Sequence, residues 1–146
     1  MPAPVGKIEI RADESGVCAL LFHADGDKND ESMYLDWAQR ELEEYFAGRR
    51  RAFSVPLSVK GTPFQQKVWR ALTDIPYGET RSYAQIAAAV GNKNAARAVG
   101  MANNKNPLPV FIPCHRVIGA NKKLTGYAGG LEIKSILLGI EERNGK

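Results

Sequence analysis

The feature that most constrains the fold of this chain is an abrupt change of character near residue 58. Residues 1–56 carry seven basic and 11 acidic side chains, whereas residues 57–146 carry 13 basic and five acidic ones. The first part contains short strand-like apolar runs, and the second part is dominated by apolar residues at helical spacing. The segment "KGTP" separates the two parts. We therefore expect an α+β protein, with a small α/β lobe at residues 1–57 and a mainly helical domain at residues 58–146.

The first part is predicted to contain three strands and one helix. Residues 7–11 and 18–23 have the apolar character of strands, and "ADESG" forms a turn between them. Residues 30–50 place apolar side chains at helical spacing, which indicates an amphipathic helix that ends at Gly48. The run "AFSVPLSV" predicts a short strand that contains a proline. Cys18 is expected in the core, because a cysteine in an apolar run behaves as a small apolar residue.

The second part is predicted to begin with three helices, of which the second and third form a helix-turn-helix. Thr62 is a suitable N-cap for the first helix, and Pro63 suits its first helical position. The second helix, "SYAQIAAAV", ends at Gly91, and Asn92 is the candidate cap of the third helix, "NKNAARAVGMANN". After a strand or turn at "CHRV" and a Gly-rich loop, "LEIKSILLGIEE" predicts a closing helix.

The charge of the second part is strongly one-sided. Between Glu79 and Glu132, 52 residues pass without an acidic side chain. This stretch carries seven basic residues: Arg81, Lys93, Arg97, Lys105, Arg116, Lys122 and Lys123. A solvated surface normally mixes both signs, so the stretch favours a polyanionic partner such as nucleic acid, although basic stretches also serve solubility.

The third predicted helix consists almost entirely of small residues around one arginine. Close packing between helices would explain Ala95, Ala96 and Gly100 without any function. Alternatively, the small side chains allow the helix to lie deep in a nucleic-acid groove. Arg97 would then be the long side chain that projects into the base stack and holds open the space left by a displaced base.

Cys114 and His115 are adjacent and represent half of the cysteines and histidines in the chain. A reactive thiol needs a partner that takes its proton, and a histidine in that role needs an acid that orients it. On a strand, neighbouring side chains point in opposite directions, so His115 would reach the sulfur only through a bent backbone or a water molecule. The late acids are Glu132, Glu141 and Glu142, and Glu141 lies near the apolar face of the last helix. The pair is either a packing accident or a nucleophile with its base.

The composition also argues against several classes of protein. No apolar run approaches the ~20 residues that a membrane helix needs, and the first residues lack the pattern of a signal peptide. We therefore expect a cytoplasmic protein that does not bind membranes. Two cysteines and two histidines without metal-ligand spacing predict no metal site. The sequence contains no Gly-rich phosphate-binding motif, so we expect no cofactor.

Several separated motifs resemble the O6-alkylguanine-DNA alkyltransferases, also called methylated-DNA–protein-cysteine methyltransferases. They occur in the order and spacing of that family and cover residues 58–142: "FQQKVWRAL", "PYGETRSYAQIA", "NAARAVGMANNKNP", "IPCHRVI", "GYAGGLEIKSILL" and the final Glu141. Residues 1–57 resemble the family's variable N-terminal lobe more loosely. The resemblance implies an RNase H-like N-terminal lobe and a winged helix-turn-helix-like element that binds DNA.

The resemblance also implies a function and a set of site residues. The chain would act as a monomer on double-stranded DNA, flip out O6-alkylguanine or O4-alkylthymine, and move the alkyl group irreversibly to Cys114. His115 would act as base through a water molecule, oriented by Glu141, while Asn106 would support the loop before Cys114. Tyr83 would donate to a guanine ring nitrogen. Arg97 would fill the gap left by the nucleotide, with Ala95, Ala96 and Gly100 against the DNA.

The alkyl pocket implied by the resemblance comprises Pro109, Val117, Gly126, Tyr127 and Ala128. Ala128 departs from family members that carry a serine, so a contact to the substrate oxygen would fall to backbone amides of the Gly-rich loop. Two alternatives from other classes remain open. A helix-turn-helix regulator would explain the basic stretch without the cysteine, and a cysteine hydrolase would explain Cys114 and His115 without Arg97.

Overall fold

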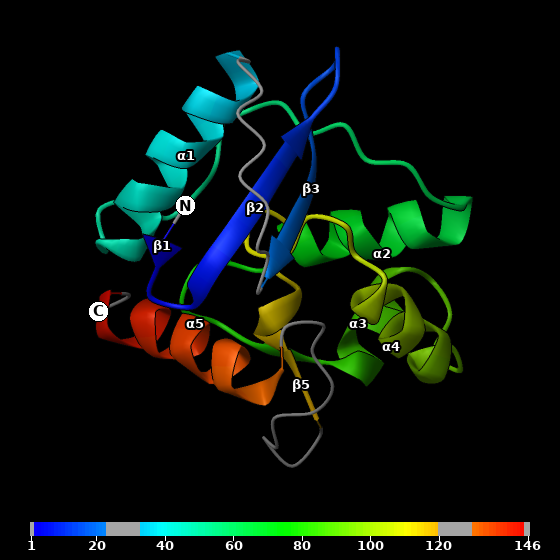
Figure 1. The fold of residues 1–146 in the computed structure, drawn as a ribbon. Coiled ribbons are helices and arrows are strands. Elements are labelled where there is room, and N and C mark those ends of the chain that lie inside the picture. The colour runs from blue at the N-terminus through cyan, green and yellow to red at the C-terminus, as the bar shows by residue number, and fades with distance from the viewer. Residues whose placement is uncertain (1, 23–32, 120–129, 145–146) are drawn as a thin grey trace. The chain divides into compact units, whose positions relative to one another are not determined.

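The computed structural model describes residues 2–22, 33–119 and 130–144. The chain divides into two compact units, Met1–Val59 and Lys60–Lys146 (Figure 1). Within the described residues, the first unit combines a three-stranded sheet with one α-helix, and the second combines four α-helices with a pair of short strands. The expected α+β class is thus confirmed. Along the same residues, no helix has the length and apolarity needed to cross a bilayer.

The first unit is an antiparallel sheet with a helix packed on it. Strands β1 (Pro2–Ala3), β2 (Gly6–Ala12) and β3 (Val17–Phe22) are neighbours in that order. Helix α1 (Met33–Phe46) contacts both β2 and β3 (Figure 1). The core between them is made of apolar side chains from both layers: Ile8, Val17, Leu20, Ala38, Leu42 and Tyr45. Cys18 follows the inward-facing Val17 and is only half-buried, so its expected place in the core is wrong.

The third strand predicted for this unit is also wrong. Only Leu57 forms an isolated bridge, to Val17. The amides of Ser54 and Val55 donate to the carboxylate of Glu41 in α1, at 3.0 and 2.8 Å. The next residue is a proline and has no amide hydrogen to give. Further along, the Pro56 carbonyl accepts from the Val17 amide at 2.9 Å, and the Ser58 amide donates to the Val17 carbonyl at 2.8 Å. Pairing with β3 is therefore limited to this one bridge, while the earlier amides bond to a side chain.

In the second unit, the first two helices begin with the same capping arrangement. Helix α2 (Pro63–Thr73) starts after Thr62, whose hydroxyl accepts from the Gln65 amide at 3.1 Å, while the Gln65 side chain accepts from the Thr62 amide at 2.9 Å. Helix α3 (Tyr83–Ala89) repeats this arrangement with Ser82 and Gln85. Such a reciprocal pair satisfies two amides that have no partner inside the helix.

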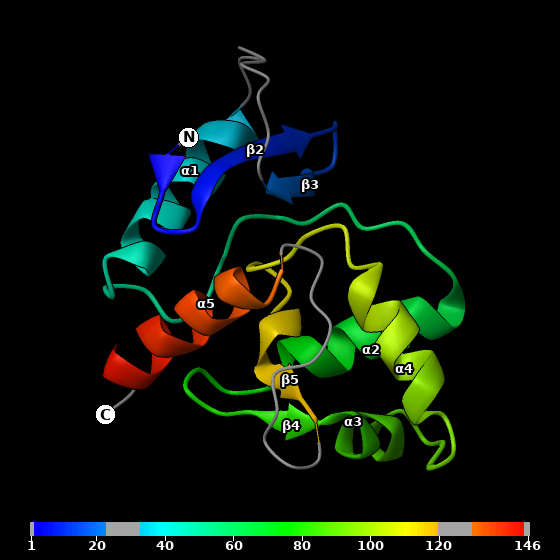
Figure 2. The same cartoon turned by 60° about the horizontal axis from the view of Figure 1, so that its bottom comes forward.

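The third helix of this unit, α4 (Ala96–Asn104), begins later than its sequence suggests. The Asn92 side chain accepts from the Asn94 amide at 3.1 Å and so closes a turn before the helix. Ala95 takes the N-cap position without a side-chain hydrogen bond, so the prediction that Asn92 caps the helix is wrong. Helices α3 and α4 pack on each other and on α2, as expected for a helix-turn-helix with a supporting helix (Figure 2).

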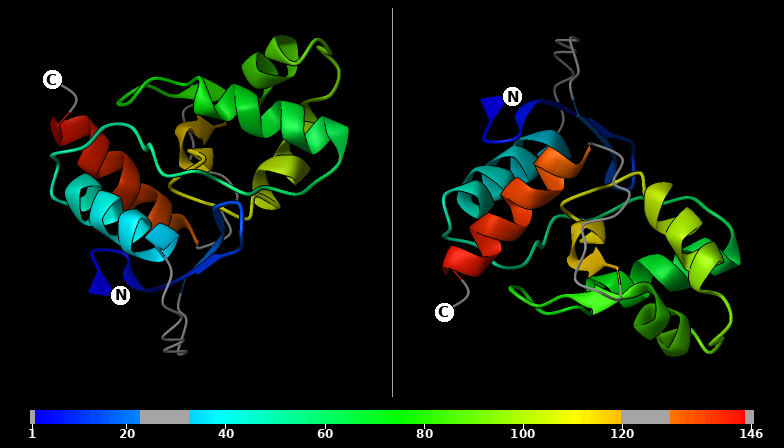
Figure 3. Two further views of the ribbon diagram at one scale, coloured as in Figure 1. Left: turned by 90° about the horizontal axis from the view of Figure 1, so that it is seen from above. Right: turned by 90° about the horizontal axis from the view of Figure 1, so that it is seen from below.

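The segment "CHRV" forms one turn of 3₁₀ helix, η1 (Cys114–Arg116), followed by strand β5 (Val117–Ile118). Strand β5 pairs in parallel with β4 (Arg81–Ser82), directly before α3. Two helices pack against η1: α5 (Leu131–Asn144) on one side and α2 on another. Figure 3 shows η1 between them. The segment that holds the cysteine is therefore fixed by helices at both sides and by a strand at its end.

Candidate active site

Cys114 lies in the core of the second unit and is only 2% exposed. Its amide donates to the Ile112 carbonyl at 2.7 Å, and its own carbonyl accepts from the Asn103 side chain at 3.4 Å. A 3₁₀ helix turns by about 120° per residue, so successive side chains do not point in opposite directions as they would on a strand. This geometry removes the objection that His115 must lie on the far side of the backbone from the thiol.

His115 and Glu141 form a buried pair. His115 Nε2 lies 2.6 Å from Glu141 Oε2, and the exposed fractions of the two side chains are 0% and 1%. Glu141 comes from α5, and the Gly78 amide also donates to its Oε1 at 3.2 Å. The two other late acids, Glu132 and Glu142, are exposed. The structure thus places Glu141 against His115, which lies 26 residues earlier and directly follows Cys114.

Arg116 completes this cluster, and sequence reasoning missed its role. Its Nε donates to Glu141 Oε1 at 2.7 Å and its Nη2 to Oε2 at 3.0 Å, while Nη1 donates to the Ile75 carbonyl at 2.7 Å. The guanidinium also lies over the Tyr77 ring, 5.6 Å from its centroid. Arg116 is one of the seven basic residues that the sequence offers to a polyanion, and this expectation is wrong for Arg116 because it is buried against Glu141.

The charge state of the cluster follows from these contacts. Burial alone would raise the pKa of Glu141, but hydrogen bonds from His115 and Arg116 outweigh it and lower the pKa to about 2. Burial lowers the pKa of His115, and the nearby cations Arg116 and Lys134 lower it further, against the opposing pull of Glu141. At neutral pH the glutamate is therefore ionised and the imidazole neutral. Nε2 must then carry the hydrogen that faces Glu141, which leaves Nδ1 as the basic ring nitrogen.

Lys134 is a second charged residue that sequence reasoning missed. It lies on α5 two helical turns before Glu141 and is fully buried. Burial lowers the pKa of this lysine, while attraction to Cys114 opposes the change. A cation in this place favours the thiolate form of Cys114. The seven-residue spacing to Glu141 was the available signal, but lysines on amphipathic helices are almost always exposed.

Asn106 holds the loop that leads to Cys114. Its Nδ2 donates to the Ile112 carbonyl at 2.9 Å, and its Oδ1 accepts from the Leu108 amide at 2.9 Å. Within this loop Val110 has φ +76°, a conformation that is strained for a β-branched residue. Pro109 is buried and forms an isolated bridge with Ile112. The loop is therefore held in an unfavourable conformation by contacts on both of its sides.

The residues predicted to meet DNA lie on and beside α4. Arg97 is exposed, Ala96 and Gly100 are half-buried, and Ala95 is buried at the N-cap. Tyr83, the first residue of α3, is half-buried. Two of its ring atoms would lie 3.8 Å from a Cβ atom placed on Gly100, which is ordinary van der Waals contact. The small residues on this helix therefore partly serve its packing against α3, as one of the two sequence interpretations held.

The predicted alkyl pocket is described only in part. Val117 is fully buried in β5, and its partner in β4 is Arg81. Gly126, Tyr127 and Ala128 lie outside the described residues. Across the part of the chain that is described, no three histidine, cysteine, aspartate or glutamate side chains gather as metal ligands would.

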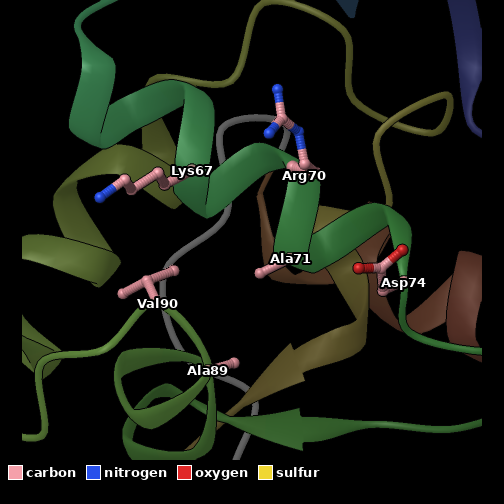
Figure 4. A pocket seen from close by; sticks show the side chains of 6 residues that line it. All are labelled: Lys67, Arg70, Ala71, Asp74, Ala89 and Val90. Carbon is pink, nitrogen blue, oxygen red and sulfur yellow. The ribbon is translucent and has the colours of Figure 1, made fainter.

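A separate cavity of about 340 Å³ lies between α2 and the end of α3 (Figure 4). It is lined by Lys67, Arg70, Ala71, Asp74, Ala89 and Val90. Figure 4 shows Lys67 and Arg70 extending in different directions from α2. None of the residues predicted for catalysis, for DNA or for the alkyl group lines this cavity, so it is not the site built around Cys114.

Comparisons with known proteins agree with this geometry. A family profile described as "6-O-methylguanine DNA methyltransferase, DNA binding domain" matches residues 63–143, and one described as the "ribonuclease-like domain" of the same proteins matches residues 1–59. The chain belongs to the 6-O-methylguanine DNA methyltransferase family. The resemblance seen in the sequence is thus confirmed, and the N-terminal unit is the family's ribonuclease-like domain.

Individual members of the family are similar along nearly the whole chain. A constitutive methylated-DNA–protein-cysteine methyltransferase of Bacillus subtilis is 53% identical over 94% of this chain and 90% of its own length. One from Methanosarcina acetivorans is 49% identical over 95% of this chain and 94% of its own. The crystal structure of Mycobacterium tuberculosis OGT in complex with DNA has a TM-score of 0.90 and 43% identity, covering 99% of this chain and 91% of that one.

Proposed function

We propose that this family member repairs O6-alkylguanine in DNA by transferring the alkyl group to the sulfur of its own Cys114. The observation that carries the proposal is the buried pair of His115 and Glu141, at 2.6 Å, directly beside a buried cysteine. The alkyl carbon on the guanine oxygen is a soft electrophile, and a thiolate is a soft nucleophile. Membership of the family and the names of its relatives support the same activity.

The cluster supplies a path for the thiol proton. The Cys114 proton passes to Nδ1 of His115 through a bridging water, because Nε2 is engaged with Glu141. The imidazolium that forms is stabilised by the ionised glutamate, which Arg116 holds in place by two hydrogen bonds. Lys134 stabilises the thiolate directly through its charge. Asn106 keeps the preceding loop, and thus the thiol, in position.

Transfer then makes one bond and breaks another. The Cys114 sulfur attacks the alkyl carbon, the carbon–O6 bond breaks, and its electron pair stays on the guanine. Tyr83 donates its phenolic proton to a ring nitrogen of the departing base and recovers a proton from solvent. The DNA receives back an unmodified guanine, and the protein keeps a thioether.

Access to a base inside the duplex requires that the nucleotide be turned out of the stack, which costs a few kcal/mol. Arg97 is exposed on α4 and would occupy the space left by the base, while Ala95, Ala96 and Gly100 allow the helix to approach the DNA closely. Pro109, Val117, Gly126, Tyr127 and Ala128 would surround the alkyl group. We extend the proposal to double-stranded DNA, to O4-alkylthymine, and to a monomer that acts in the cytoplasm.

The reaction should occur once per molecule. A thioether is a poor leaving group, and His115 cannot activate water enough to cleave a carbon–sulfur bond at neutral pH. The chain contains one other cysteine, Cys18, and it belongs to the other unit. The alkylated protein is therefore the end product.

The test is mass spectrometry of the intact protein and its peptides after incubation with duplex DNA that contains O6-methylguanine. We expect one added methyl group, located on Cys114, and a time course that levels off at one methyl per chain. A DNA-binding regulator would bind without any adduct, and a cysteine hydrolase would leave methylated DNA unchanged. Continued removal of methyl groups well beyond one per chain would contradict the single-use mechanism.

A further inference from the structure

Helix α4 carries one large apolar side chain that the proposed chemistry does not use. Met101 is 59% exposed, although α4 buries Val99, Ala102 and Asn103 on its other side. An α-helix advances by about 100° per residue, so Met101 lies only about 40° around the axis from Arg97. Single exposed apolar side chains are common on proteins, so the position of Met101, and not its exposure alone, is what matters.

We propose that Met101 is a second DNA-contacting side chain, which packs against the sugar and base edge next to the gap that Arg97 fills. This inference rests on the proposed function, because it takes the exposed face of α4 as the surface that meets duplex DNA. The charge of that face favours the assignment: Arg97 and Lys105 are exposed on or at the end of α4, and Lys93 is exposed just before it. The residues that flank Met101 in the sequence, Gly100 and Ala102, are both small.

The chemistry of methionine suits this place better than a general phosphate contact. A thioether donates no hydrogen bond and neutralises no charge, so it contributes little to phosphate binding. It is flexible and polarisable, and it packs well on irregular apolar surfaces. In a groove, such surfaces are the faces of the deoxyriboses and the base faces exposed where a step is unstacked. Proteins that kink DNA insert methionine at such steps.

Met101 should therefore stabilise, together with Arg97, the DNA in which the damaged nucleotide is flipped out of the stack. Met101→Ala should slow repair of duplex DNA by about five-fold, which corresponds to about 1 kcal/mol. The same change should leave reaction with the free base O6-methylguanine within about two-fold, since a free base needs no flipping. Met101→Leu should recover most of the duplex activity. The dependence of DNA affinity on salt should not change, because no phosphate contact is lost.

A direct measurement uses methyl-labelled methionine and NMR, with the Cys114→Ala variant so that the complex persists. The chain has three methionines, and Met33 in the other unit is 70% exposed, so it serves as an internal reference. Addition of duplex DNA containing O6-methylguanine should shift the Met101 methyl resonance and leave that of Met33 unchanged. Met33→Ala is the matched control variant, and its repair rate should equal that of the unaltered protein.

The outcomes separate this inference from the function on which it rests. If duplex DNA binds and is repaired, but the Met101 resonance does not move, the inference is wrong and the proposed function stands. Equal losses on duplex and free base in Met101→Ala would also overturn it, since the residue would then support the fold of the site. If the protein neither binds nor demethylates duplex DNA, the proposed function itself fails.

Discussion

Among the residues that the structure describes, each of the two units buries one glutamate. The comparison between them shows what distinguishes a structural carboxylate from a chemical one. Glu41 and Glu141 are both 1% exposed, and both are contacted by an arginine, Arg50 at 2.9 Å and Arg116 at 2.7 Å. Glu41 otherwise accepts from the Ser54 hydroxyl and from backbone amides. Glu141 accepts from one backbone amide, that of Gly78, but it also accepts from His115, a group that can take a proton.

The difference teaches that burial and low pKa do not by themselves mark an active site. Burial would raise the pKa of Glu41, but the hydrogen bonds from Ser54 and Val55 and the charge of Arg50 lower it, as the partners of Glu141 do for that residue. A carboxylate surrounded by backbone amides can only hold a segment in place. A carboxylate bonded to an imidazole beside a thiol can change the charge on that thiol. The partner, and not the carboxylate, decides the role.

The most direct test of the comparison is to remove the thiol of Cys114, which directly precedes the histidine bonded to Glu141. Cys114→Ala should abolish methyl transfer and leave affinity for methylated duplex DNA within a few-fold, because the thiol contacts no phosphate. Single-turnover transfer assays and binding titrations measure the two quantities. Loss of binding in a variant that is still folded would mean that Cys114 acts as a structural residue.

Replacement of each glutamate in turn should give the next largest effect. Glu141→Gln should slow transfer by about 100-fold, because an uncharged amide stabilises the imidazolium poorly. Glu41→Gln should leave the rate per folded molecule within about two-fold. Rates are to be divided by the folded fraction, since loss of the Glu141 charge also leaves Arg116 buried without a countercharge. The exposed neighbours give matched controls, Glu142→Gln for Glu141 and Glu43→Gln for Glu41.

Unfolding by denaturant should reveal the structural role of Glu41. Glu41→Gln should lower the free energy of unfolding by about 2–3 kcal/mol, because the amide cannot satisfy the donors of Ser54, Val55 and Arg50 together. Glu43→Gln should change it by less than about 0.5 kcal/mol, as for other exposed positions. Equal stability of the two variants would show that the segment after α1 does not depend on Glu41.

Lowering the pH should reduce the contribution of both Glu41 and Glu141 to the free energy of unfolding. The pKa of Glu141 in the folded protein is about 2, below its ordinary 4.5. A lowered pKa contributes stability that is complete above the ordinary pKa and is lost as the pH falls toward the folded value. Unfolding free energy should therefore hold down to about pH 5 and then fall by on the order of 3 kcal/mol towards pH 2 from this residue. Glu141→Gln should make that fall shallower, and an unchanged slope would contradict the low pKa.

The smallest effect on the transfer rate is expected when Glu141 is changed in a variant that already lacks His115. His115→Ala and Glu141→Gln should each slow transfer, but the double variant should be slower than His115→Ala by no more than about two-fold. Once the base is gone, the group that orients it no longer affects the reaction. Losses that multiply in the double variant would give Glu141 a role apart from His115, such as fixing Arg116 in the core.

Most local features were predicted correctly from the sequence, although the cap at Asn92 was not, and features that depend on distant contacts were missed. The start of α2 was predicted because Thr62 and Pro63 form their cap within one turn. The prediction of a strand at "AFSVPLSV" failed because the amides of Ser54 and Val55 bond to Glu41, 13 and 14 residues earlier. Arg116 and Lys134 carry charges that normally face solvent, and nothing within a few residues of either indicates burial. Arg116 is held by Glu141, 25 residues later, so its burial cannot be predicted from the residues near it in the sequence.

The near-complete burial of Cys114 has a consequence for how the protein survives in a cell. A thiolate open to solvent would meet peroxide and small electrophiles continually, and a protein that reacts once would lose a competent molecule at each encounter. Cys114 is only 2% exposed, so little of the residue is open to such reagents. The number of competent molecules should then decline with the number of damaged bases presented to them, and not with general oxidative conditions.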